Sequence, residues 1–129
     1  MADEPSHEFT EGVYGWITHT DIASTDPAAT ARWCETVLGW TIRPPFEGPK
    51  GSYQLFTYAD TGGGGIRAVE PLEAPGSTPF VHVRDAQAAF DGALAAGAEA
   101  IQPPTRVMEG VTTALVRAPG GVVIGLSGP

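Results

Sequence analysis

The order of elements that the sequence predicts occurs twice along the chain, and this internal duplication limits the fold more than any other feature. Each half reads as a strand, a helix and three further strands. The first helix begins at the cap signal Thr25-Asp26-Pro27 and ends at Gly39, and the second begins at Asp85 and ends at Gly97. Neither half is large enough to bury its own sheet face, so we expect both halves to form one fold.

Short apolar segments with alternating polarity predict the strands of both halves. We expect strands at residues 13–24, 40–43, 52–59 and 65–69, and again at 78–84, 98–102, 111–117 and 122–126. The four-glycine run Gly62 to Gly65 is expected as a turn or flexible loop. The helix over residues 27–38 is expected to bury one stripe of side chains: Trp33, Cys34, Val37 and Leu38.

These elements predict the α+β class, with two βαβββ modules at about residues 13–70 and 77–128. Side by side, the modules would form one curved mixed sheet with helices on its convex side. We expect one domain over residues 11–129, preceded by a polar, acidic tail at residues 1–10.

The charge balance and the single cysteine exclude several classes of function. Fifteen acidic residues face seven Lys and Arg in 129 residues, a formal net charge of −8. No basic cluster is available to bind nucleic acid or an anionic membrane, and no apolar run is long enough to span a bilayer. Cys34 alone cannot form an internal disulfide, and no secretory signal is evident, so we expect a cytoplasmic protein.

Particular segments resemble the vicinal oxygen chelate superfamily, which includes glyoxalases, bleomycin resistance proteins and extradiol dioxygenases. In the first half these are residues 19–26, Trp33 and the run Val37-Leu38-Gly39-Trp40. In the second half they are residues 83–85, 96–98, 103–104 and 118–126. The resemblance implies paired βαβββ modules, a ligand cavity on the concave sheet face, and frequent homodimers.

The resemblance also implies where a divalent metal would be held: by a His or Gln on the first strand of a module and a Glu on the fourth strand. His19 matches the first position, but Thr78 is its equivalent in the second half. The carboxylate positions correspond to Gly125 and, in the first half, to Gly65 or Arg67. The ligand set is incomplete, so no metal cofactor is favoured. If one is bound, the expected ligands are His19, His82 and Asp21.

Strand alternation places several candidate residues on the same face as His19. Asp21 lies two positions further along that strand, and Phe80 and His82 share a face with Thr78. His19 and Asp21 are candidates for general acid–base catalysis, or His19 is a structural remnant of a ligand position. Further ligand-binding candidates are Trp40, Tyr53 and Arg67, with Arg67 pairing with a ligand anion or exposed at a sheet edge.

Three functions remain open at this stage. The first is a metal-independent protein that binds a small apolar or aromatic compound. The second is a lyase, isomerase or dioxygenase-like enzyme with an atypical site around His19, Asp21 and His82. The third is a regulatory or structural dimer subunit whose cavity is filled by its own side chains. Fold resemblance alone does not choose among them.

Overall fold

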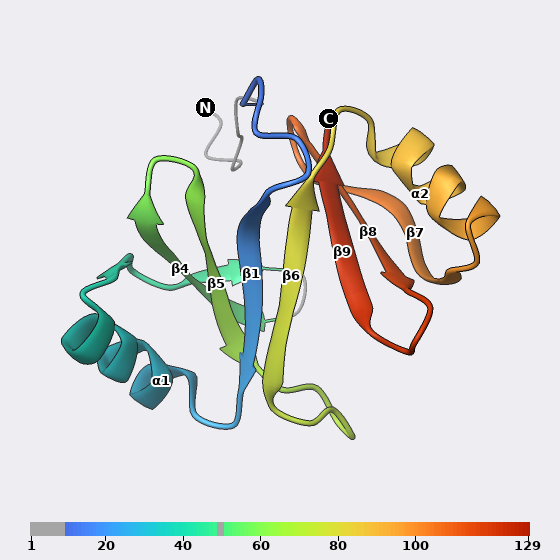
Figure 1. The fold of residues 1–129 in the computed structure, drawn as a ribbon. Coiled ribbons are helices and arrows are strands. Elements are labelled where there is room, and N and C mark those ends of the chain that lie inside the picture. The colour runs from blue at the N-terminus through green and yellow to red at the C-terminus, as the bar shows by residue number, and fades with distance from the viewer. Residues whose placement is uncertain (1–9, 49–50) are drawn as a thin grey trace. The chain divides into compact units, whose positions relative to one another are not determined.

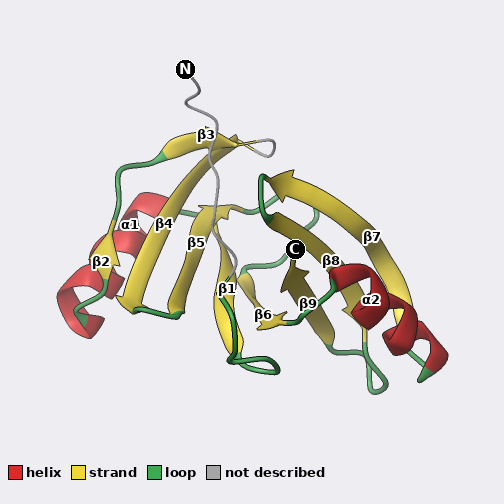
Figure 2. Ribbon diagram, turned by 90° about the horizontal axis from the view of Figure 1, so that it is seen from above, coloured by secondary structure: helices red, strands yellow, loops and turns green. Residues whose placement is uncertain are grey.

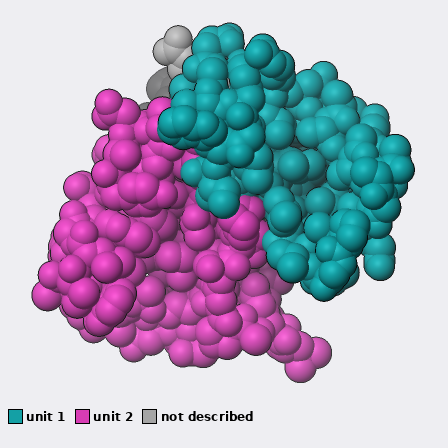
Figure 3. Space-filling model, in the orientation of Figure 1, with its two compact units in different colours: residues 1–17, 80–129 teal, residues 18–79 magenta. Residues whose placement is uncertain are grey.

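The computed structural model describes residues 10–48 and 51–129. Of the expected N-terminal tail, only Thr10 belongs to this described part. The chain forms two compact units, Thr18–Pro79 and Phe80–Pro129, the second completed by N-terminal residues up to Ile17 (Figure 3). Both units combine a mixed sheet with helical segments, so the predicted α+β class is confirmed.

The unit Thr18–Pro79 packs α1 against a mixed sheet (Figures 1 and 2). Its elements are β1 (Ile17–Ser24), α1 (Pro27–Trp33), the π-helix η1 (Cys34–Leu38), β2 (Thr41–Ile42), β3 (Phe46–Gly48), β4 (Gly51–Ala59) and β5 (Gly62–Ala68). Strands β2, β3 and β5 all pair antiparallel with β4, and β5 also pairs parallel with β1. Ala31, Phe56 and Ile66 form the buried core between helix and sheet.

The other unit repeats this plan with fewer elements (Figure 2). Its elements are β6 (Gly76–His82), α2 (Ala86–Ala95), β7 (Glu99–Met108), β8 (Val111–Arg117) and β9 (Val123–Gly128). Strand β6 pairs parallel with β9, which pairs antiparallel with β8, and β8 pairs antiparallel with β7. Its core contains Phe90 from the helix with Ala114 and Val116 from β8.

Both predicted helix starts are confirmed at the level of single hydrogen bonds. The Asp26 carboxylate accepts the backbone N–H of Ala29 at 3.1 Å, and the Asp85 carboxylate accepts that of Ala88 at 3.0 Å. Gly39 adopts the left-handed conformation at φ 71°, as expected for a residue that closes a helix. Local capping chemistry therefore fixes where both helices begin and where the first one ends.

The four-glycine run is a strand, and its interpretation as a turn or flexible loop was wrong. Gly62 to Gly65 form the first half of β5, between β4 and β1. A Cβ atom at Gly64 would collide with the carbonyl oxygen of Thr20, and one at Gly65 with the ring of Tyr53. The glycines allow close approach of neighbouring groups, which is a common reason for glycine inside a strand.

The predicted buried stripe of the first helix was also wrong in most of its members. Cys34 is buried, but Trp33, Val37 and Leu38 are 56%, 57% and 46% exposed. Ala31 packs against Phe56 and Ile66 of the sheet, and Cys34, which is also buried, lies three residues further along on the same face of the helix. Trp33 lies two residues from Ala31, which turns its side chain away from the sheet.

The largest differences from the predicted strands are in β1, β3 and β7. Strand β1 begins at Ile17, later than expected, because positive φ angles at Gly12, Val13 and Gly15 interrupt extended structure before it. The short β3 was not predicted. Strand β7 continues through Pro103 and Pro104 to Met108, which a strand paired on one side only can accommodate.

Candidate functional site

The sheet of the unit Thr18–Pro79 carries a polar cluster on the face away from its core. Ile22, Phe56 and Ile66 point toward α1, and their neighbours along each strand therefore point to the other face. That face receives four side chains that the sequence analysis named as candidates: His19, Asp21, Tyr53 and Arg67. Strand alternation thus assigns Tyr53 to this face and Phe56 to the core, a choice that the sequence left open.

His19 and Tyr53 are joined by a hydrogen bond of 3.0 Å between the imidazole Nε2 and the phenolic oxygen. Burial lowers the pKa of His19, although the nearby Asp21 carboxylate opposes this shift. Burial also raises the pKa of Tyr53, and the negative charge of Asp21 adds to the effect. At neutral pH the pair therefore consists of an uncharged imidazole and a protonated phenol.

Arg67 connects two carboxylates from different parts of the unit. Its Nε donates to Asp21 Oδ2 at 3.1 Å, and its terminal nitrogens donate to both oxygens of Glu73 at 2.7 and 2.8 Å. The hydrogen bonds to Glu73, and then those to Asp21, raise the pKa of the guanidinium against the effect of burial. The side chain of Arg67 is only 13% exposed, so it is held within the protein.

Sequence analysis did not find Glu73. It lies in the connection after β5, where no strand register assigns side chains to a face. A signal was nevertheless present, because a guanidinium held within the protein has five N–H donors and Asp21 alone cannot accept hydrogen bonds from all of them. Glu70 and Glu73 are the first acidic residues after Arg67 in the sequence.

An aromatic ring lies over a glycine in each unit, at Gly125 and at Gly65, which with Arg67 is one of the two candidates for the carboxylate position of the first half. In the unit Thr18–Pro79, the Tyr53 ring occupies the space where a Cβ of Gly65 would be. In the other unit, the Phe80 ring occupies the same space over Gly125, its partner in the ladder between β6 and β9. Neither position has room for a longer side chain unless the ring moves.

The remaining candidates are placed elsewhere. Trp40 stacks on Phe56 in the core, with ring centroids 4.3 Å apart, and so does not join the polar cluster. The bulk of Trp40 is used to cover the core at the point where η1 ends. His82 is 6% exposed, and its Nε2 donates to the carbonyl oxygen of Thr10 at 2.7 Å while its ring stacks on Tyr14.

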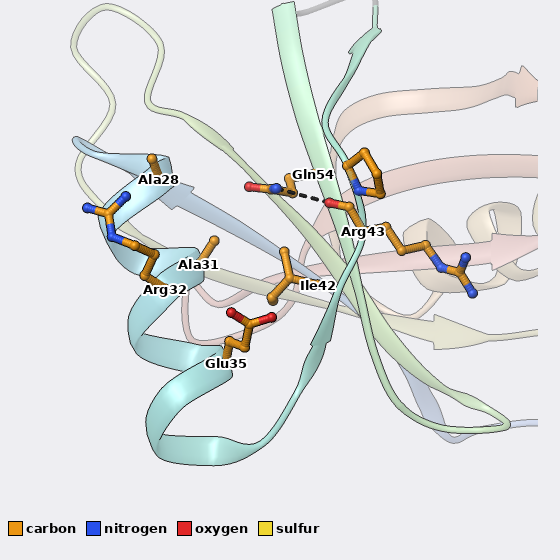
Figure 4. A pocket seen from close by; sticks show the side chains of 8 residues that line it. Ala28, Ala31, Arg32, Glu35, Ile42, Arg43 and Gln54 are labelled. Atoms are coloured by element: carbon orange, nitrogen blue, oxygen red, sulfur yellow. Dashed lines mark hydrogen bonds between the residues drawn. The ribbon is translucent and has the colours of Figure 1, made fainter.

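Two surface hollows lie apart from the polar cluster. One of about 340 Å³ lies between α1 and the segment from β2 to β4, where Gln54 donates to the carbonyl oxygen of Arg43 (Figure 4). Its lining residues are Ala28, Ala31, Arg32, Glu35, Ile42, Arg43, Pro44 and Gln54. The other, of about 380 Å³, lies beside α2, with Tyr14 and Arg84 in its wall. Within residues 10–48 and 51–129, no helix is long and apolar enough to cross a membrane.

Comparison with known families agrees with the repeated βαβββ order. The family model of the Glyoxalase/Bleomycin resistance protein/Dioxygenase superfamily matches residues 16–126, which is most of the chain. The chain belongs to this superfamily. The resemblance noted in the sequence is thereby confirmed, and the superfamily includes the vicinal oxygen chelate proteins named above. No curated protein sequence matches the chain.

Solved structures share the fold of this superfamily member at low sequence identity. A hypothetical protein from Bacillus halodurans has a TM-score of 0.71 at 12% identity, with 87% of this chain and 92% of that chain covered. Methylmalonyl-CoA epimerase from Mycobacterium tuberculosis has a TM-score of 0.69 at 17% identity, with 95% and 93% covered. A Streptomyces coelicolor methylmalonyl-CoA epimerase in complex with 2-nitronate-propionyl-CoA gives 0.66 at 15% identity, with 90% and 97% covered.

The residues at the superfamily's metal-ligand positions do not fit a divalent metal. His19 is a good donor, but its Nε2 is bonded to Tyr53, and the corresponding glycines offer no oxygen ligand. The guanidinium of Arg67, 2.9 Å from Asp21 Oδ2, would also repel a cation bound at that carboxylate. Among the described residues, no three His, Cys, Asp or Glu side chains are grouped closely enough to hold a metal.

Proposed function

We propose that the chain is a metal-independent small-molecule-binding protein of the glyoxalase/bleomycin-resistance type. The observation that carries this proposal is an aromatic ring over each of two glycines, Tyr53 over Gly65 and Phe80 over Gly125, at positions where the resemblance implies a carboxylate or, in the first half, offers Gly65 beside Arg67. A site that loses its metal ligands and gains aromatic surface becomes better suited to flat organic compounds. The ligand would lie against the polar cluster, where Tyr53 offers an aromatic ring and His19 a polar edge.

The sequence also supports a proposed location and a proposed class of partner for the chain. A cytoplasmic location agrees with the free and buried Cys34, whose pKa is raised by burial and which therefore stays a thiol. We extend the proposal to a homodimer, which is frequent in the superfamily, and to a small molecule as the only class of partner. The net charge of −8 argues against nucleic acid and anionic lipid as partners.

The test is an elemental analysis of untagged protein together with native mass spectrometry. We expect iron, manganese, zinc and nickel far below one equivalent, and either a co-purified organic mass or binding of aromatic compounds at micromolar concentrations. One equivalent of metal that survives dialysis would contradict metal independence. Failure of a broad set of aromatic compounds to bind at high micromolar concentration would contradict the ligand class.

A second candidate function is metal-free proton transfer by a lyase or isomerase, and the bond between His19 and Tyr53 favours it. An uncharged imidazole can accept a proton, and a neighbouring phenol can orient it or return the proton. His82 would not take part, because its Nε2 hydrogen is donated to Thr10. The epimerases of similar fold make methylmalonyl-CoA a rational first substrate to try.

Proton transfer is tested by following deuterium incorporation into methylmalonyl-CoA in heavy water by NMR. If the chain is such an enzyme, exchange is accelerated by the wild-type protein and abolished in His19→Gln. A His82→Gln variant provides the matched control and should retain the exchange. Exchange at the uncatalysed rate in the wild-type protein would rule out this substrate class.

A further inference from the structure

The guanidinium of Arg67 has no donor left for a ligand. Its Nε and terminal N–H groups donate to Asp21, to both oxygens of Glu73 and to the carbonyl oxygen of Ala68. The second terminal nitrogen also lies 2.9 Å from Asp21 Oδ2. A guanidinium has five N–H donors, and this arrangement faces all of them with acceptors from the same unit. An incoming carboxylate or phosphate would have to displace one of these partners.

Among the partners of Arg67, Glu73 is the one whose removal would most change the donors that Arg67 can offer to a ligand. It takes two of the hydrogen bonds in the paired geometry that a ligand carboxylate would adopt. Its side chain is 32% exposed, against 17% for Asp21, so it is the more accessible of the two carboxylates. Glu73 thus occupies two donors of Arg67 that an anionic ligand would need.

The turn that carries Glu73 is itself held in place. The backbone N–H of Glu73 donates to the carbonyl oxygen of Glu70 at 3.0 Å, and the N–H of Glu70 donates to Glu73 Oε1 at 2.8 Å. This turn lies in the connection that follows β5 (Figure 1). Because both ends of the turn are bonded to each other, Glu73 is presented to Arg67 with little loss of side-chain freedom.

We propose that Glu73 determines the charge of the ligand, so that the site takes cationic or uncharged aromatic compounds and rejects anions. This inference rests on the small-molecule-binding function proposed above. Two carboxylates against one guanidinium leave the cluster with one net negative charge. A cationic ligand is attracted by that charge, whereas an anion meets repulsion and no available donor.

The test uses three probes of nearly the same shape and different charge: benzamidine, benzamide and benzoate. Binding to the full chain is measured by saturation-transfer NMR, and the site is located by shifts in the His19 and Arg67 side-chain signals. The variant is Glu73→Gln, which removes the charge and keeps the size. The control is Asp60→Asn, which makes the same change in charge at an exposed turn residue between β4 and β5.

Wild-type protein and Asp60→Asn should bind benzamidine most tightly, benzamide next, and benzoate at least about tenfold more weakly than benzamidine. Glu73→Gln should bind benzoate about tenfold more tightly than the wild type does and so lose most of the preference for benzamidine, because an amide cannot accept both guanidinium hydrogen bonds of the carboxylate. If Glu73→Gln does not fold, the order of the three probes on the wild-type protein still tests whether the site selects ligands by charge.

Three other outcomes would overturn the inference. Benzoate binding to the wild-type protein as tightly as benzamidine would remove charge selection while leaving the small-molecule function intact. An unchanged preference for benzamidine over benzoate in folded Glu73→Gln would show that Glu73 does not set the selection. Binding of none of the probes to any variant would instead contradict the binding function itself, and the charge selection with it.

Discussion

Gly125 is a residue whose identity depends on one neighbouring ring. Placing a Cβ at this position would drive it into the ring of Phe80, whereas a Cβ at Gly76 would meet nothing within 4 Å. We expect Gly125→Ala to lower the free energy of unfolding by about 1–3 kcal/mol through overpacking, and Gly76→Ala to have little effect. Urea denaturation measures both. Stability in Gly125→Ala equal to that of the wild type would contradict the packing of Phe80 described above.

His19 should make stability depend on pH in a defined direction. Its pKa is lowered by burial from 6.5, so the unfolded chain binds a proton at a pH where the native protein does not. The free energy of unfolding should therefore decrease as pH falls below about 7 and continue to decrease until the native His19 is protonated. His19→Gln should flatten this part of the profile, as measured by urea denaturation between pH 5 and 8.

The matched control is the pH slope of both proteins near pH 8, at the upper end of the measured range. At pH 8 His19 is uncharged in both states, so the pH slope that it contributes there is zero in either protein. Equal slopes for His19→Gln and wild type below pH 7 would show that His19 is not buried as the structure has it.

Strand alternation predicted His19 and Asp21 on one face, because it depends only on counting along a single strand. It did not decide on which face of the sheet Tyr53 lies, because β4 carries aromatic residues on both faces and alternation alone does not show which set faces the core. Glu73 was out of reach of this reasoning, since its position depends on a turn and on the reach of Arg67. Residues in strands could thus be placed in part, whereas a partner from a loop could not.

At the scale of elements, α1 and η1 show how weakly apolar character alone predicts burial. Trp33 is 56% exposed, although Phe56 beneath the helix is 1% exposed. We expect Trp33→Gln to change the free energy of unfolding by no more than about 0.5 kcal/mol. Phe56→Leu, the control within the core, should lower it by at least about 1 kcal/mol. Urea denaturation of the two variants gives the comparison.

A loss in Trp33→Gln as large as that in Phe56→Leu would show that Trp33 is covered in the protein in solution. A second copy of the chain would be the first partner to examine, by repeating the measurement at several protein concentrations, since subunit association makes stability depend on concentration.

The helix ends were predicted well because each depends on local chemistry: Asp26 and Asp85 as caps, and Gly39 as a left-handed closing residue. The strand β5 was missed for the opposite reason. Its glycines are selected by what lies against them, Tyr53 and the Thr20 carbonyl among others, and composition alone reads them as a turn. An element that is specified by long-range contacts can be predicted from the sequence only when those contacts are known.

At the scale of the whole molecule, the duplicated order of elements was the most reliable signal, and it led to the superfamily. Each unit has its own buried cluster, one around Phe56 and one around Phe90. Each also has an aromatic ring packed over a glycine, Tyr53 over Gly65 in one unit and Phe80 over Gly125 in the other.

The rings over Gly65 and Gly125 leave little room for a metal, and this predicts how the whole chain responds to metals. A metal that binds only the native state raises the melting temperature, by an amount that grows with its concentration relative to the dissociation constant. We expect treatment with a chelator to leave the melting temperature within about 1 °C of that of the untreated protein. We expect the same result when manganese, zinc or nickel is added at a concentration of about 100 times a micromolar dissociation constant. Differential scanning calorimetry measures the shift, and His19→Gln serves as the control because it removes the imidazole donor. A rise of several degrees in the wild-type protein that is absent in His19→Gln would show that a metal does bind at the site.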